Sequence, residues 1–488
     1  MGTPIRALAL IAMRLAVVSA HSIACTVVDD DSGVPVQSAT ARLSSSKGAI
    51  AEARTDAFGR FLIGGLAQGG YRIEIAKANH IPAIVRLSAQ MESLPSESSA
   101  PDPVVRLIRY GVISGVVVPA QGGSVLAFKT SREGEPSGSL QAAADLNSRG
   151  EFRLSSLPPG RYEIGLRIVP GGGSRRIGFV MYPSAAQPTE FTITGGEEYA
   201  GIVIPVPVVE AVKVSGRVST PGGGRRFPVR IAAADYPSVT LSTVQTEASG
   251  GFEFDSVLPG TYDLFVSAPG APGALFGRAG FQVSGFSIEN IEVALVPGRT
   301  AGFVLGTTGS RNVARLCGLD ANLTVTAEEA WATAARKSTH VTRERPAIIE
   351  GLAPGRYRIT LQSASGCDGT IIGALDLTDG SQLEPLVVTL VPPGHIQGMV
   401  VGEKPGARLA VVLVALESGE KWPVQVAFVD AGQEFSFDGL PTGRYSASAS
   451  PATEQSGRWA PGPASRVIES TAWESEAVEL RVSGNRDR

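Results

Sequence analysis

The sequence predicts an all-β protein made of five tandem β-sandwich domains arranged end to end. A strand motif with alternating Phe and apolar residues runs into a turn that ends in Gly, and a Tyr follows two residues later. The motif occurs five times along the 488 residues, and its second copy, residues 150–164, reads GEFRLSSLPPGRYEI. Its tyrosines are 91, 100, 95 and 88 residues apart, about the length of one small domain: Tyr71, Tyr162, Tyr262, Tyr357 and Tyr445.

Alternating apolar segments open and close each repeat. In the second repeat these are residues 112–117 and 202–206, and the other four repeats have equivalents. Period-two alternation is typical of a strand with one face in a core. Roughly six to eight short strands per repeat, without a helical period, favour a β-sandwich.

The motif itself predicts a hairpin that fills the core. Phe152 and Leu154 lie two residues apart and therefore face the same side of a strand. Gly160 is expected to supply the positive φ of a type II turn, after which Tyr162 resumes the alternation. A buried Tyr needs a partner for its hydroxyl, so we expect a bond to a nearby backbone carbonyl. The predicted core residues are Phe61, Tyr71, Phe152, Tyr162, Phe252, Tyr262, Tyr357, Phe435 and Tyr445.

The repeat spacing sets the predicted boundaries. Residues 1–21 are read as a signal segment, and the five sandwiches as residues 22–109, 110–208, 209–297, 298–392 and 393–488. Short linkers that often contain proline predict semi-rigid coupling and hence a monomeric rod. Within the first repeat, the Ser, Glu and Pro content of residues 90–103 predicts a mobile loop.

Composition narrows the function classes. The net charge of −3 offers no field that would attract nucleic acid or an anionic membrane. Arg6 precedes an apolar run at residues 7–20, which predicts an export signal, although these residues could also lie upstream of a later start site. No other apolar stretch approaches the roughly 18 residues of a membrane helix, so no transmembrane span is expected.

Two of the three cysteines fall in the same repeat. Cys317 and Cys367 belong to the fourth repeat, in which Ala347 replaces the motif Phe. The smaller side chain would lower the free energy of unfolding by on the order of 3 kcal/mol. A disulfide that closes so long a loop would raise it by about 4 kcal/mol. We therefore predict a disulfide, which needs an oxidising compartment. The alternative is two buried thiols in a small core.

Cys25 has two interpretations. Residues 22–25 have some similarity to a bacterial lipobox, in which the Cys is acylated, but Ser22 stands where an aliphatic residue is usual. Alternatively, Cys25 is a residue of the first strand. In alignment it takes the position of the opening-strand glycines of the other repeats, Gly115, Gly216, Gly302 and Gly398.

The first repeat shows a family resemblance most clearly. Its segments VVD (27–29), GVPV (33–36), ATARL (39–43) and TDAFGRF (55–61) resemble those of the carboxypeptidase regulatory-like domains. The resemblance covers nearly the whole chain after about residue 22. It implies a transthyretin-like, or prealbumin-like, sandwich with Greek-key order. Such domains resemble accessory modules beside peptidase domains, receptors and surface adhesins, and they share a fold type with starch-binding modules.

The chain lacks the motifs of a peptidase. His21, His80, His340 and His395 have no Glu three residues on and no His nearby, so no zinc site, cofactor or catalytic residue is expected. We interpret the protein as a non-catalytic, exported bacterial spacer or binding scaffold of the cell envelope, outside the cytoplasm, with a protein or glycan partner at the cell surface. One alternative is carbohydrate binding through loops with Trp422, Trp459 and Trp473. Another is an accessory component of an envelope or peptidase complex.

Overall fold

The structure, a computed structural model, is all-β and confirms the five tandem sandwiches. It describes residues 21–45, 48–66, 71–87, 103–130, 139–170, 175–219, 225–268, 273–306, 317–318, 320–327, 336–363, 367–371, 375–391, 394–402, 408–415, 423–440, 443–451, 466–470 and 478–482. Residues 1–20 of the predicted signal segment and most of the 90–103 loop lie outside these residues, whereas His21, its last residue, begins the first strand.

One layer of each sandwich has three strands. The opening strand is central, and it pairs antiparallel with the Phe strand of the motif and parallel with the closing strand. In order along each layer, these strands are β4 (Arg60–Leu66), β1 (His21–Asp29) and β7 (Val104–Leu107); β11 (Glu151–Leu157), β8 (Gly111–Val118) and β15 (Glu198–Pro205); β19 (Gly251–Val257), β16 (Val212–Ser219) and β22 (Ile288–Ala294); β27 (Ala347–Leu352), β24 (Arg299–Leu305) and β31 (Gln382–Val391); β35 (Glu434–Leu440), β32 (Gly394–Gly402) and β38 (Val478–Val482).

The opposite layer carries the Tyr strand. Its strands are β3 (Gly48–Arg54), β2 (Thr40–Ser45), β5 (Tyr71–Ala76) and β6 (Ala83–Leu87); β10 (Ser139–Asp145), β9 (Gly123–Lys129), β12 (Gly160–Ile168), β13 (Gly178–Met181) and β14 (Phe191–Ile193); β18 (Tyr236–Gln245), β17 (Pro228–Ala233), β20 (Gly260–Ala268), β21 (Leu275–Val283) and β23 (Val296–Pro297); β26 (Arg336–Thr342), β25 (Asp320–Ala327), β28 (Arg356–Gln362), β29 (Asp368–Ile371) and β30 (Leu375–Asp376); β34 (Pro423–Asp430), β33 (Arg408–Ala415), β36 (Gly443–Pro451) and β37 (Arg466–Ser470). In the fourth sandwich the two layers join, because β29 pairs with β31.

The motif turn therefore crosses from one layer to the other, and the predicted hairpin is wrong. In the second domain, β11 pairs with β8, whereas β12 pairs with β9 in the facing sheet. Both arms of the motif still point into the space between the layers, because Phe152 and Tyr162 are buried in one cluster. Alternation fixes which side chains face the core, and a crossing turn satisfies it as well as a hairpin does.

The glycine before the motif Tyr serves close packing. Gly160 is absent from the residues with positive φ, so the expected type II turn is not formed. At the equivalent Gly260, an added Cβ would lie 2.9 Å from the hydroxyl oxygen of Tyr262. The ring folds back over the glycine, and its hydroxyl donates to the Leu258 carbonyl at 2.8 Å. In the third repeat, this close contact leaves no room for a Cβ two residues before the Tyr.

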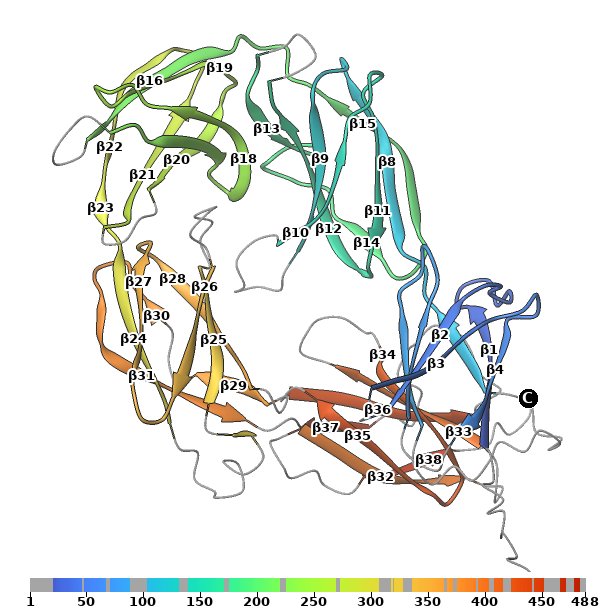
Figure 1. Ribbon diagram of the computed structural model, residues 1–488. Helices are drawn as coiled ribbons and strands as arrows, with labels where there is room; N and C mark the ends of the chain where they lie inside the picture. The colour runs from blue at the N-terminus through green and yellow to red at the C-terminus, as the bar shows by residue number, and fades with distance from the viewer. Residues whose placement is uncertain are drawn as a thin grey trace, which may run out of the picture.

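The five sandwiches follow one another end to end, yet the line closes into a ring, so the predicted rod is wrong (Figure 1). Strand β6 of the first domain pairs in parallel with β34 of the fifth. The two domains thereby share one eight-stranded sheet, in the order β3-β2-β5-β6-β34-β33-β36-β37. Linker length alone predicts a rod, because it does not account for the apolar surface that this closure buries.

Candidate functional site

The contact that closes the ring, here called the seam, is formed by one face of the fifth domain and the rim of the first. Val426 pairs with Val85, Ala427 with Arg86, and Phe428 with Leu87. Side chains alternate along β34. Ala427 and Val429 belong to the core of the fifth domain, whereas Val426 and Phe428 belong to the core of the first. The strand is thus shared by two cores.

The neighbouring strand β33 follows the same pattern. Its Val411 and Leu413 face the core of the fifth domain, while Ala410 and Val412 join the first-domain core. Phe428 and Ala410 are fully buried, and Val412 is only 9% exposed. Three large apolar side chains and one alanine would therefore face solvent if the first domain were not there.

Strands with apolar residues on both faces mark the junctions between domains. In β9, Val125 and Ala127 face their own core, whereas Leu126 and Phe128 join the core of the third domain. Strands β2 and β25, in contrast, carry polar outward residues such as Arg42 and Asn322. The first domain covers the outer face of β33 and β34 in the fifth, as the third domain covers the outer face of β9 in the second. The sequence signal for the seam is the run LAVVL at residues 409–413.

A polar cluster lies in the first domain and includes Arg109, at the boundary with the second. The Asp29 carboxylate accepts a hydrogen bond from Ser32 Oγ at 2.6 Å, one from Arg109 Nε at 2.5 Å, and lies 3.1 Å from His80 Nε2. Burial alone would raise the pKa of Asp29, but these bonds lower it from 3.8 to about 2. His80 Nδ1 lies 3.0 Å from the Ala78 carbonyl. Both ring nitrogens thus lie within hydrogen-bond distance of oxygen atoms.

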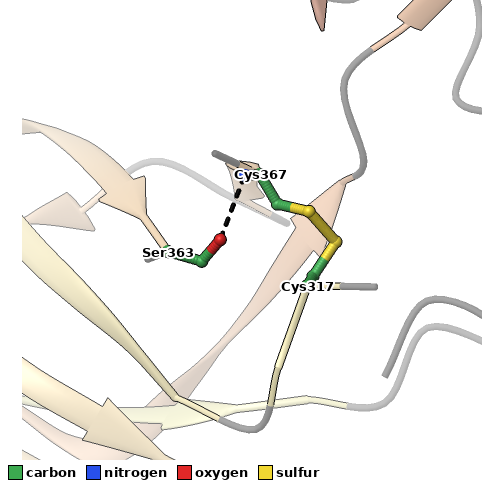
Figure 2. The surroundings of a disulfide bond; sticks show 3 residues. All are labelled: Cys317, Ser363 and Cys367. Carbon is green, nitrogen blue, oxygen red and sulfur yellow. Dashed lines mark hydrogen bonds between the residues drawn. A yellow bond between two sulfur atoms is a disulfide. The ribbon is translucent and has the colours of Figure 1, made fainter. Parts of the chain in front are cut away.

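The cysteines assigned from the sequence are in two different settings. Cys317 and Cys367 are joined by a disulfide with a Cα–Cα distance of 5.5 Å, and the Cys367 amide donates to Ser363 Oγ (Figure 2). Cys25 is buried in the middle of β1 and pairs with Phe61. This position agrees with the first-strand interpretation. An acylated Cys would have to leave the core.

In the fourth domain, the Phe side chain that fills the core comes from the opposite strand of the pair. In the second domain Gly115 pairs with Phe152, but here Phe303 pairs with Ala347. Phe303, which is fully buried, therefore takes the place of the missing Phe. The predicted alignment of Gly302 with the other opening-strand glycines is wrong by one residue.

The assigned core residues lie where the motif puts them. All are buried except Tyr71, which is half-buried against the first core. The hydroxyl of Tyr162 donates to the Pro158 carbonyl at 2.6 Å, and that of Tyr357 donates to Ala353 at 2.8 Å. Burial raises the pKa of Tyr162 to about 12. These side chains are occupied with folding.

The structure does not describe the three tryptophans proposed to bind sugar. Trp422, Trp459 and Trp473 lie outside the described residues. Within the described part of the chain, no group of three or more His, Cys, Asp or Glu side chains is placed to hold a metal ion. In that part there is also no helix long and apolar enough to cross a membrane.

Comparison with known proteins gives weak structural likenesses. No family model and no curated protein matches the chain. Among solved structures, the Bacillus anthracis TIE protein is 13% identical, with a TM-score of 0.18 over 56% of this chain and 50% of its own length. A streptococcal ancillary pilin is 17% identical, with a TM-score of 0.21 over 58% of this chain and 98% of its own. Two B repeat units of the collagen-binding protein of Staphylococcus aureus are 9% identical, with a TM-score of 0.14 over 76% of this chain and 99% of theirs.

The chain spans half the length of the Bacillus anthracis protein. All three TM-scores are too low to support an inference about this chain. Since no family model matches, membership of the carboxypeptidase regulatory-like family stays a prediction.

Proposed function

We propose that this protein is a non-catalytic scaffold of the bacterial cell envelope, in which a closed ring of sandwiches holds surface loops in fixed relative positions. The observation that carries the proposal is the seam. The shared sheet and shared core tie the fifth domain to the first. A closed ring limits the relative motion of its domains more strongly than a chain joined only by linkers.

Two observations support a location outside the cytoplasm. The run at residues 7–20, apolar apart from Arg14 and polar Ser19, follows Arg6, as in an export signal. The disulfide between Cys317 and Cys367 closes a loop of 50 residues, and such bonds persist in oxidising compartments. The partner in the proposed role is a protein or a glycan at the cell surface.

The test is fractionation of the native host together with the intact mass of the mature protein. The proposal predicts an envelope or secreted fraction, loss of the N-terminal segment, and a mass two hydrogens lighter than that of the reduced chain. A cytoplasmic protein with an intact N-terminus and reduced cysteines would contradict it.

A glycan array tests the carbohydrate alternative. Binding that a single substitution, Trp422→Ala, Trp459→Ala or Trp473→Ala, removes would replace the scaffold role by a lectin role. Absence of binding across diverse glycans would contradict the carbohydrate alternative.

A further inference from the structure

We propose that the seam surface of the fifth domain also binds the first domain of a second copy of this chain. The inference concerns association between copies and does not depend on where the protein is located. Its basis is that the seam joins two different patches, and every copy of the chain carries both.

A contact between two different patches can form within one chain or between neighbouring chains. The first patch is the β6 edge with the core rim around Val85, and the second is the β34 edge with Val426 and Phe428. Such a head-to-tail contact generates a ring where the geometry closes and an open series of copies where it does not. Within one chain, the geometry closes after five domains (Figure 1).

The fifth domain can leave the first without losing its own core. Its core cluster consists of fifth-domain residues only, among them Val411, Phe437 and Tyr445. Among the described residues, one buried apolar cluster joins the second and third domains and another joins the third and fourth. The cluster of the fourth domain, in contrast, contains no fifth-domain residue, and that of the fifth contains no fourth-domain residue. Departure of the fifth domain from the first therefore breaks no buried apolar cluster shared with the fourth.

Opening would expose a surface suited to the same partner. Val412, Val426 and Phe428 would face solvent beside an unpaired strand edge. An apolar face next to a free edge is a template for strand pairing. The first domain of another copy offers the same edge in the same register, with Val85 opposite Val426.

Concentration decides between the two arrangements. Linked modules meet at an effective concentration in the millimolar range when the linkage is short and spans the two sites. A closed monomer should therefore dominate at micromolar protein, and pairing between copies should accumulate as the concentration approaches the millimolar range. Refolding from denaturant at high concentration should increase the fraction of chains paired with another copy, because the domains then fold before the ring of one chain closes.

Two differently tagged variants, Val85→Cys and Val426→Cys, test this. They are checked for folding by circular dichroism, mixed over a range of concentrations, and oxidised under mild conditions. We expect a cross-linked heterodimer whose yield rises with concentration. In the matched control, Val467→Cys replaces Val426→Cys, because Val467 is 65% exposed on the same sheet and does not pair with β6.

A variant that carries both Val85→Cys and Val426→Cys in one chain tests whether closure within the chain competes with association. It should cross-link within one chain and thereby abolish association between copies. The proposal is overturned if the mixed variants yield no more heterodimer than the Val467→Cys control at any concentration, including after refolding. Failure of the double variant to cross-link within the chain would overturn the seam as well.

Discussion

Replacing Phe428 by alanine is expected to open the ring while the fifth sandwich stays folded. The Phe428 ring is fully buried, but it packs into the core of the first domain. Its neighbours Ala427 and Val429 point the other way, into the core of the fifth. The substitution therefore removes side-chain volume from the seam and leaves the fifth-domain core as it is.

The size of the effect follows from the burial. Full burial of one large apolar side chain contributes about 1.5–3 kcal/mol, so Val412, Val426 and Phe428 together contribute on the order of 5–9 kcal/mol as an upper estimate. Phe→Ala substitutions in cores cost about 3–5 kcal/mol. A loss of about 3 kcal/mol lowers the closed-to-open ratio roughly 100-fold. Because 5–9 kcal/mol is an upper estimate, from which the entropy lost on closure is still to be subtracted, a measurable open population is expected after this loss.

Small-angle scattering and thermal unfolding measure the two consequences separately. Phe428→Ala should lengthen the maximum dimension, while the unfolding transition of the fifth domain is retained. Phe437→Ala, placed in the fifth-domain core, should instead weaken that transition. Val467→Ala, on the exposed face, should change neither. The reasoning is refuted if Phe428→Ala keeps the scattering curve of the wild type and destabilises the fifth domain as Phe437→Ala does.

Three further predictions concern the other domains. Reduction of the Cys317–Cys367 disulfide, which closes a 50-residue loop, should destabilise the fourth domain by about 4 kcal/mol, seen by calorimetry with and without reductant. Asp29→Asn should cost about 2 kcal/mol at neutral pH, because hydrogen bonds, first those of Ser32, lower the pKa of Asp29 from 3.8 to about 2. The cost should persist above pH 4 and be lost as the pH falls through 2, whereas a constant difference would contradict the role of these bonds. Phe303→Ala should lower the free energy of unfolding of the fourth domain by about 3–5 kcal/mol, and adding Ala347→Phe should recover part of this loss in a double-mutant cycle. Strictly additive effects would refute the idea that Phe303 replaces the motif Phe.

Much of the fold could be predicted from the sequence, because alternation and the Gly-to-Tyr spacing are local signals. Phe152 and Tyr162 face the core for the reason that the alternation gives. The pairing partner of each arm was missed, since alternation reports a face and not a neighbour. Gly302 was misaligned for a related reason. The sequence shows a glycine near the expected position, but not that Phe303 rather than Gly302 pairs with Ala347.

The seam could have been predicted from one feature that linker analysis ignores. Residues 409–413 are apolar at every position, whereas the equivalent segment of the first domain, residues 39–43, alternates with Arg42 outward. A strand that is apolar on both faces needs a cover on both. Which domain supplies the second cover depends on the curvature accumulated over four junctions, and that quantity is not local.

Small-angle scattering of the wild-type protein at micromolar concentration tests the central claim, closure of five sandwiches through β6 and β34, most directly. The account predicts a compact pair-distance distribution whose maximum is well short of five sandwiches laid end to end. A distribution with the long tail of an extended rod would contradict it.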